Sequence, residues 1–218
     1  MQKEIQNQQE LWNSIAPEWH KYKEIPSELS KEFLKKQTGN ILDLGSGSGR
    51  HLTKIKSGVI KSLTSSSKSQ TKGKMYLLDF SEEMIKLAEK RAKEKKIPAE
   101  FIVSEMNKIS FKDNFFDSAI CISALHCTPK KEHKKIIKEL YRVLKPKSQA
   151  LIGVWNFKSK RFNQKNGKEK LVGWTDKGKR YYYLFDESEV YKLFTNAGFK
   201  IISKHNSEMM INFIVQKN

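Results

Sequence analysis

The sequence is poor in cysteine: Cys121 and Cys127 are its only two, and their spacing is not the CxxC of a zinc site. We therefore expect no metal, and we interpret Cys121, which lies in an apolar run, as a packed core thiol. No uninterrupted apolar stretch approaches the roughly 20 residues that cross a bilayer. Residues 1–10 are polar and lack the apolar stretch of a signal peptide. These absences predict a cytoplasmic protein without membrane contact.

Acidic residues are also scarce, because 24 Asp and Glu stand against 42 Lys and Arg and leave a net charge of +18. Such a field attracts a polyanion such as RNA. A lysine bias of this kind also arises from genome composition alone, so the total charge does not decide between the two readings. The clustering favours RNA: residues 158–180 combine nine basic residues with Phe162 and Trp174. Such a mixture can hold phosphates and stack unpaired bases.

The apolar periodicity predicts strands that alternate with helices along one α/β domain, residues 1–218. Pro17 is expected to end or bend the first helix, and Asp186 with Glu189 forms a capping-box pattern. The expected helices are 5–19, 26–36, 50–56, 81–95, 130–144 and 186–196. The expected strands are 40–44, 75–79, 99–103, 117–123, 149–155, 199–205 and 210–216.

This order predicts a doubly wound, mostly parallel seven-stranded sheet with a carboxy-terminal antiparallel hairpin and helices on both faces. Three segments stand apart from that core. Residues 1–38 are expected to form a helical lid. Residues 57–74, rich in Ser, Lys, Thr and Gly, are expected to be a flexible surface insertion. Residues 157–183 are interpreted as a basic insertion that recognises substrate.

Ligands of such sheets lie beyond the carboxyl ends of the strands. After the first strand comes a glycine turn, Gly45-Ser-Gly47-Ser-Gly49, whose residues allow close backbone approach and positive φ. A dinucleotide site prefers GxGxxG, whereas this turn reads GxGxG. Asp43, two residues ahead of the turn, repels a phosphate but suits the cationic amino group of a methionine moiety. The charges favour S-adenosylmethionine over NAD.

The next strand ends favour the same cofactor. Asp79 ends the second strand, where a carboxylate can accept hydrogen bonds from both ribose hydroxyls. Glu105 and Met106 follow the third strand, and Met106 can pack on the adenine ring. Each residue alone has an ordinary reading as a turn carboxylate or a core methionine, but their order makes the set specific. The expected cofactor contacts are Asp43, Gly45, Ser46, Gly47, Gly49, Asp79, Phe80, Glu105, Met106 and Ser123.

Several stretches resemble the successive motifs of class I S-adenosylmethionine-dependent methyltransferases: ILDLGSGSGRH, MYLLDFSEEMIKLAEKRA, FKDNFFDSAICISALHC and HKKIIKELYRVLKPKSQALIGVWN. WNSIAPEW, ALHC, QALIGVWN and GKRYYYLFDESEVYKLFTNAGF are similar to the tRNA wobble-uridine methyltransferases. This resemblance implies a Rossmann-like class I methyltransferase fold and S-adenosylmethionine as cofactor. It also implies methyl esterification of a 5-carboxymethyluridine in tRNA.

The resemblance also implies residue roles. Arg180, Tyr181 and Tyr182 match an arginine–tyrosine–tyrosine motif beside the acceptor site. The family's arginine after the first helix is matched only loosely, by Lys21 or Lys23. Ser46 stands where many members have cysteine, and Cys127 replaces a second histidine or aromatic residue. The expected catalytic residues are His126, Arg180 and Tyr181, and the expected substrate contacts are Lys21, Trp155, Asn156, Arg180 and Tyr182.

A carboxylate acceptor is already a nucleophile at neutral pH, so it needs no general base. Catalysis then requires alignment of the acceptor with the transferred methyl group. Arg180 is expected to hold a carboxylate or a phosphate by paired hydrogen bonds, and Tyr181 or Tyr182 to stack on the extruded uracil. The ordinary alternatives are a strand with alternating packing at residues 181–183, a solvated Arg180 at the end of the basic run and a structural His126.

Two other functions are compatible with the core motifs. A small-molecule methyltransferase, acting on a metabolite, quinone or lipid, predicts an apolar pocket under Trp12, Trp155 and Phe157. A catalytically silent RNA-binding or scaffold subunit predicts cofactor binding without methyl transfer. The resemblance further implies two partners, tRNA and a small zinc-binding activator subunit that covers an apolar sheet edge. The candidate residues for that edge are Ile102, Phe111, Phe115 and Phe116.

Overall fold

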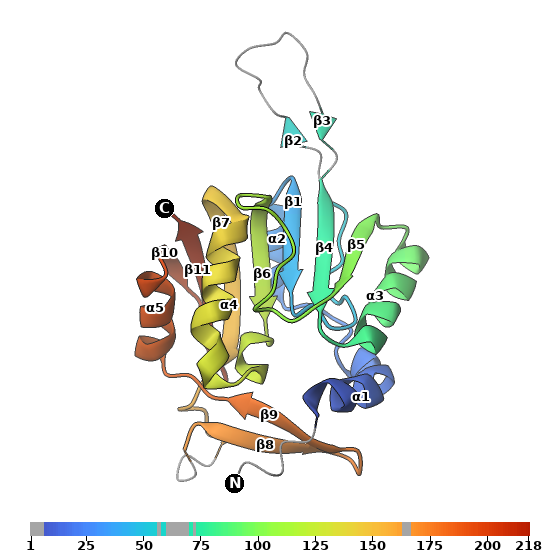
Figure 1. Cartoon of the computed structure of the whole chain (residues 1–218), viewed down its shortest axis with the longest axis vertical. Coiled ribbons are helices and arrows are strands. Elements are labelled where there is room, and N and C mark those ends of the chain that lie inside the picture. Colours follow the sequence, from blue (N-terminus) through green and yellow to red (C-terminus); the bar gives the residue numbers. More distant parts are fainter. Residues whose placement is uncertain (1–6, 56–57, 60–69, 72, 163–166) are drawn as a thin grey trace.

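The computed structural model describes residues 7–55, 58–59, 70–71, 73–162 and 167–218. Its main feature is a seven-stranded sheet with the order β10-β11-β7-β6-β1-β4-β5 (Figure 1). The strands β7, β6, β1, β4 and β5 are parallel, and β11 pairs antiparallel with both β7 and the edge strand β10. The strands are β1 (Asn40–Leu44), β4 (Lys74–Asp79), β5 (Ala99–Val103), β6 (Phe116–Ile122), β7 (Leu144–Trp155), β10 (Phe199–Lys204) and β11 (Met210–Lys217).

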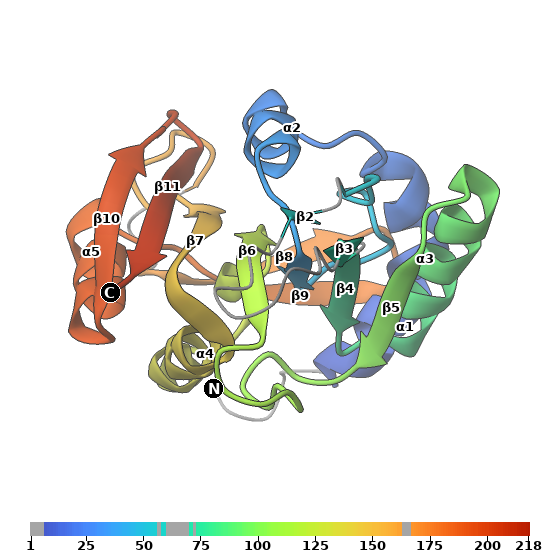
Figure 2. The same cartoon turned by 90° about the horizontal axis from the view of Figure 1, so that it is seen from above.

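Helices cover both faces of this sheet, as Figure 2 shows for α2 (Glu28–Lys35) and α4 (Lys130–Val143). One core joins α2 and α3 (Glu82–Lys95) to the sheet through Phe33, Leu34 and Ala88, among others. The opposite core joins α4 and α5 (Glu187–Asn196) to the sheet. The predicted doubly wound architecture, with its carboxy-terminal hairpin, is confirmed. Cys121 is 2% exposed within the second core, so its interpretation as a packed thiol is also confirmed.

The predicted helix 50–56 is wrong over its described residues, 50–55. Residues 50 and 51 continue the turn of the glycines, and residues 52–55 are irregular. Gly47 and Gly49 have φ of +53° and +73°, and the Leu52 N–H bonds to the Gly49 carbonyl, three residues back. Left-handed residues interrupt the α-helical path, so the chain leaves the sheet as a succession of turns.

The first helix also differs from its prediction. Its start at residue 5 lies outside the described residues, and the observed helix α1 is Gln8–Tyr22, capped by the Asn7 side chain. Pro17 lies inside it and does not end it. The capping box at Asp186 is wrong as well, because its side chain makes no cap hydrogen bond and instead pairs with Lys168 at 2.6 Å. The cap at Ser81, by contrast, is confirmed by its bond to the Met84 N–H.

The basic segment holds a hairpin, β8 (Glu169–Trp174) paired with β9 (Gly178–Tyr183), of which the sequence offered only residues 181–183 as an alternative strand. It lies with α1 beyond the carboxyl ends of the parallel strands (Figure 1). β9 buries four consecutive residues, whereas β8 alternates between exposed and partly buried positions. In the predicted insertion, β2 (Gly58–Val59) pairs with β3 (Gln70–Thr71), and residues 60–69 lie outside the described residues. No helix among the described residues is long and apolar enough to span a bilayer.

Candidate active site

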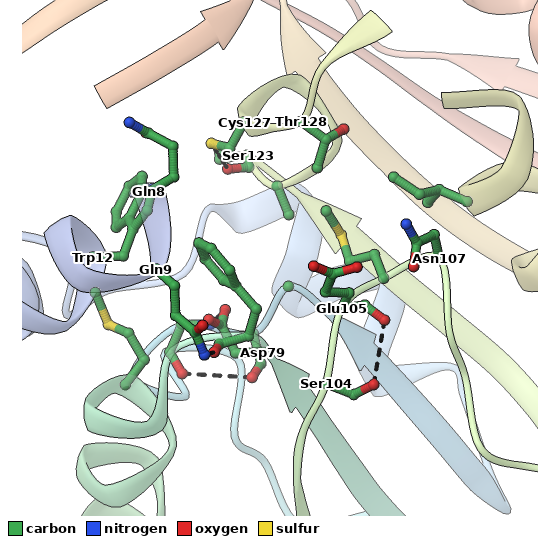
Figure 3. Close-up of a pocket in the computed structure, with 18 of the residues that line it drawn as sticks. Gln8, Gln9, Trp12, Asp79, Ser104, Glu105, Asn107, Ser123, Cys127 and Thr128 are labelled. Carbon is green, nitrogen blue, oxygen red and sulfur yellow. Dashed lines mark hydrogen bonds between the residues drawn. The ribbon is translucent and has the colours of Figure 1, made fainter. Parts of the chain in front are cut away.

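Two adjoining cavities lie at the carboxyl ends of the parallel strands. The first, about 780 Å³, is enclosed by the glycine turn, the ends of β4, β5 and β6, and α1. Figure 3 shows Trp12, Asp79, Glu105 and Ser123 arranged around it. The second, about 550 Å³, lies between α1, α2, the end of β7, the β8–β9 hairpin and the β10–β11 turn. Six residues line both cavities: Trp19, Lys23, Arg50, His51, Ile122 and Ser123.

The glycine turn forms the floor of the first cavity. At Gly45, with φ of +72°, a Cβ would lie 2.2 Å from the Ala124 Cβ, so no larger residue fits there. At Gly47 an added Cβ would meet nothing nearer than 4.0 Å, which leaves its backbone open to a ligand. Gly49 differs, because it packs against Leu52, Ala88 and Leu77 and does not line the cavity. Residues 45–48 are therefore the part of the turn that lines the cavity.

Asp79 is fixed at the cavity wall by two backbone hydrogen bonds. Its Oδ2 accepts from the Gly47 N–H at 2.8 Å, and its Oδ1 accepts from the Ser81 N–H at 3.0 Å. Burial raises its pKa to about 6, against the lowering effect of those bonds. Each carboxylate oxygen retains a lone pair beyond its backbone bond. The geometry thus leaves two acceptor oxygens, which suit the predicted contact with a pair of vicinal hydroxyls.

The remaining predicted cofactor contacts come mostly from neighbouring strand ends. Glu105 and Met106, after β5, and Ser123, after β6, all line the first cavity. Phe80 lines it too, and its carbonyl accepts a 2.7 Å hydrogen bond from Gln9 Nε2. That bond holds α1 over the cavity. Four segments, at the ends of β1, β4, β5 and β6, therefore bring the predicted set together, with the exception of Gly49 and Asp43.

Asp43 does not reach the cavity. Its side chain is 1% exposed, and its oxygens lie 3.2 and 3.3 Å from His51 Nδ1. His51 lines both cavities, is 3% exposed, and has no partner at Nε2. Sequence reasoning missed His51, because the predicted helix 50–56 gave it no relation to Asp43. Its only sequence signal was a titratable residue directly after the glycine turn.

Arg180 occupies an aromatic cage in the second cavity. It is 5% exposed, and its guanidinium carbon lies 4.8 Å from the Trp174 ring centroid and 5.2 Å from that of Trp19. Trp12 and Tyr182 complete the cage. Its Nη2 donates to the Gly173 carbonyl at 3.3 Å, whereas Nε has no partner. Among the described residues no carboxylate pairs with it.

Three further cations surround this cavity: Lys23, Arg50 and Arg161. The pKa of Lys23 is lowered mainly by burial, and the positive charges of Arg50, Arg161 and Arg180 lower it further. Two carboxylates also line the cavity, Glu28 and Glu32, and Glu28 is paired with Lys31 at 3.1 Å. The cavity therefore has a positive potential that an anion would relieve.

His126, predicted to be catalytic, lies behind the cavity wall. It is 1% exposed, its Nδ1 accepts the Trp155 N–H at 3.0 Å, and its ring stacks on Trp155 with centroids 5.0 Å apart. Tyr182 stacks on the same indole at 4.3 Å. Burial is the main cause that lowers the pKa of His126 to about 3, so the ring is neutral at physiological pH. The structure brings Trp155 to the second cavity, with His126 and Tyr182 supporting it from behind.

Of the remaining residues predicted to be catalytic or to contact substrate, some line a cavity and others do not. Tyr181 lines the first cavity, and its backbone N–H donates to Gln8 Oε1 at 2.9 Å. Lys21 is exposed and lines neither cavity, whereas Lys23 lines both. Asn156 also lines neither, since its side chain donates to the Glu208 carbonyl at 3.3 Å. Of the two lysines that the sequence offered, the structure places only Lys23 at the site.

Glu18 joins α1 to the β8–β9 hairpin and so closes the site. Its two oxygens accept from Trp174 Nε1 at 2.6 Å and from Lys177 Nζ at 2.5 Å. The hydrogen bonds from Lys177 and Trp174 lower the pKa of Glu18. The helix and the hairpin, 156 residues apart in sequence at this contact, therefore form one wall.

A strand-end glycine turn, a carboxylate at the end of the next strand and a seven-stranded sheet of this order are typical of a class I methyltransferase. The family described as methyltransferase domain matches residues 35–198, and the chain belongs to it. Its cofactor is S-adenosylmethionine. The first cavity suits that molecule, because its volume lies within the roughly 300–1,000 Å³ of small-molecule sites. Its Gly47 leaves backbone space, and an unpartnered His51 nitrogen lies at its wall.

Two curated relatives of this chain are named for different substrates, a quinone and tRNA. A demethylmenaquinone methyltransferase of Lactococcus lactis is 31% identical over 63% of this chain and 54% of its own length. A probable tRNA methyltransferase 9B of Bos taurus is 28% identical over 73% of this chain and 31% of its own length. The chain thus spans about half or less of the length of these relatives.

Two solved structures share the fold. A S-adenosylmethionine-dependent methyltransferase of Methanosarcina mazei superposes with a TM-score of 0.67 at 26% identity, covering 88% of this chain and 98% of that one. A Haloferax volcanii methyltransferase, solved in complex with the Trm112 methyltransferase activator, also gives 0.67, at 15% identity over 97% of this chain and 96% of that one. The second likeness concerns the fold alone.

Proposed function

We propose that this methyltransferase acts on tRNA and esterifies the carboxymethyl group of a wobble uridine. The observation that carries the proposal is Arg180, a buried cation caged by aromatic rings and without a carboxylate partner among the described residues. A buried charge without a counter-ion is unfavourable, so the site is completed by an anionic ligand. The neighbouring rings supply flat surfaces for a base.

The proposed chemistry needs little from the protein beyond placement. S-adenosylmethionine supplies an electrophilic methyl group, and a carboxylate is a nucleophile without deprotonation. Arg180 binds that carboxylate through its fork of N–H groups, and Trp155, stacked on Tyr182, offers its indole to the uracil. Arg161, whose guanidinium lies 5.3 Å from the Trp155 centroid, is placed for a flanking phosphate. The tRNA relatives support the same substrate class.

The small-molecule alternative is favoured by the quinone-modifying relatives, of which the first is 31% identical. It predicts an apolar pocket under Trp12, Trp155 and Phe157. Of these, only Trp155 lines the second cavity, which instead carries Lys23, Arg50, Arg161 and Arg180. Such a cavity favours an anion over a neutral quinone.

The experiment compares nucleosides from tRNA of cells with and without the gene by mass spectrometry. We expect the methyl ester of 5-carboxymethyluridine to disappear without the gene and the free acid to accumulate. Unchanged esters would contradict the proposal. Methylation of a quinone that saturating tRNA does not inhibit would establish the small-molecule function. Cofactor binding without transfer to undermodified tRNA, with all partners present, would establish the silent RNA-binding subunit.

We also propose that a small zinc-binding activator covers the edge strand β5. The edge exposes Val103 at 47%, and Ile102, Phe111 and Phe115 are partly exposed beside it. Phe116, predicted for the same surface, is fully buried against Tyr76 and belongs to the core. Support comes from the fold of the Haloferax volcanii protein that was solved in complex with the Trm112 methyltransferase activator.

The expected result is that co-expression with the activator increases the soluble yield at least several-fold and that the two proteins co-purify. Replacing Ile102 with aspartate should abolish co-purification, because a charge on the apolar edge has no partner. Lys96→Asp, at the exposed end of α3, is the control and should leave co-purification unchanged. A soluble, fully active monomer that does not co-purify with the activator would contradict this proposal.

A further inference from the structure

The Asp43–His51 pair lies where the two cavities meet, and neither the glycine turn nor the acceptor site explains it. Both side chains are almost completely buried, at 1% and 3% exposure. His51 lines the cofactor cavity and the acceptor cavity, whereas Asp43 lines neither. The buried carboxylate can therefore act on a ligand only through the imidazole.

The contact with Asp43 determines which ring nitrogen of His51 remains available to a ligand. Asp43 lies 3.2 and 3.3 Å from His51 Nδ1, so a carboxylate acceptor there places the proton on Nδ1. In the neutral ring Nε2 is then a hydrogen-bond acceptor. That atom is buried and has no partner. A ligand that completes the pair must donate a hydrogen bond, and the carboxylate behind the ring favours a donor with positive charge.

We infer that His51, oriented by Asp43, binds the α-ammonium group of the methionine moiety of S-adenosylmethionine. The sequence suggests Asp43 itself for this role. Asp43 is buried behind His51 and does not line the cavity, so His51 is the residue that can make the contact. The neighbouring Arg50, which also lines both cavities, supplies a cation for the α-carboxylate of the same zwitterion. The inference rests on the cofactor alone and not on tRNA as acceptor, so failure of the nucleoside experiment leaves it intact.

The test is calorimetry with three ligands that differ only in the tail. S-adenosylhomocysteine has both charges, its decarboxylated form has only the ammonium, and 5′-methylthioadenosine has neither. His51→Ala is expected to weaken binding of the first two about tenfold, because a hydrogen bond to a charged group is lost. Binding of 5′-methylthioadenosine should stay unchanged, which also reports that the site is folded. Asp43→Asn should give the same selectivity with a smaller loss.

His205→Ala is the matched control, since His205 lines only the acceptor cavity and should affect none of the three ligands. Equal losses with all three ligands, or none, would overturn the inference. A loss confined to the carboxylate-bearing ligand would also overturn it and assign His51 to the carboxylate. Should both variants fail to fold, ¹⁵N-histidine spectra of the unmodified protein decide the matter. The His51 Nε2 resonance must shift with S-adenosylhomocysteine and not with 5′-methylthioadenosine.

Discussion

Replacing Asp79 with alanine is expected to weaken S-adenosylmethionine binding by about 100-fold. The carboxylate is held by the Gly47 and Ser81 N–H groups with one lone pair per oxygen left for the ribose hydroxyls. Two hydrogen bonds to a charged acceptor contribute roughly 1.5 kcal/mol each, and about 3 kcal/mol corresponds to slightly more than a 100-fold change in affinity. Calorimetric titration of the purified protein measures this directly.

Glu100→Ala is the matched control for Asp79→Ala. Glu100 lies on the neighbouring strand β5, and its carboxylate pairs with Lys74 at 2.6 Å, away from the cavity. We expect its removal to leave cofactor affinity unchanged. Thermal unfolding of both variants verifies that each retains its fold. Wild-type affinity in a folded Asp79→Ala protein would contradict the ribose assignment.

The pH dependence of binding gives a second test of Asp79. Burial raises its pKa to about 6, above the ordinary value of 3.8, so the carboxylate becomes protonated as the pH falls through about 6. Protonation removes acceptor capacity, so affinity should be highest above pH 7 and decline towards pH 5. Bound ribose hydroxyls favour the charged form and lower the pKa in the complex. The Asp79→Ala protein should lack this dependence.

Much of the cofactor site could be predicted from the sequence because parallel strands bring their carboxyl ends to one edge. Gly45, Asp79 and Glu105 each follow a short apolar run, and local spacing alone puts them at that edge. Asp43 shows the limit of this reasoning. It also sits at a strand end, yet its side chain points to His51, a contact set by the turns after Gly49. The path of those turns depends on backbone dihedrals, which spacing does not encode.

The acceptor cavity was harder to predict, since segments distant in sequence build it. Leu171 and Val172 are adjacent in β8 and lie among charged residues, so no alternation of apolar and polar residues indicated this strand of the hairpin. The choice between Lys21 and Lys23 depended on where α1 ends. Helix α1 continues past Pro17 to Tyr22, and the C-cap Lys23 bonds its N–H to the Trp19 carbonyl. This arrangement brings Lys23, and not Lys21, against the Trp19 and Tyr22 rings.

Replacing Arg180 with methionine is expected to reduce methyl transfer to tRNA by about 100-fold while cofactor affinity stays unchanged. Arg180 lines only the second cavity and so lies outside the cavity that we assign to S-adenosylmethionine. The loss corresponds to two hydrogen bonds from a charged group, about 3 kcal/mol in total. Methionine keeps much of the apolar volume inside the cage of Trp12, Trp19 and Trp174, so the fold should persist. Initial rates with tRNA from cells that lack the gene give the measurement.

Two further variants separate charge, geometry and packing at this position. Arg180→Lys keeps the charge but loses the planar fork, so we expect about a tenfold loss, intermediate between wild type and methionine. Lys179→Ala removes an exposed cation from the adjacent position of β9 and should leave the rate unchanged. If Arg180→Met binds the cofactor and transfers methyl groups at the wild-type rate, the guanidinium only packs against its rings. The anionic acceptor would then lose its principal support, because no other cation in the cavity combines burial with an unpartnered N–H.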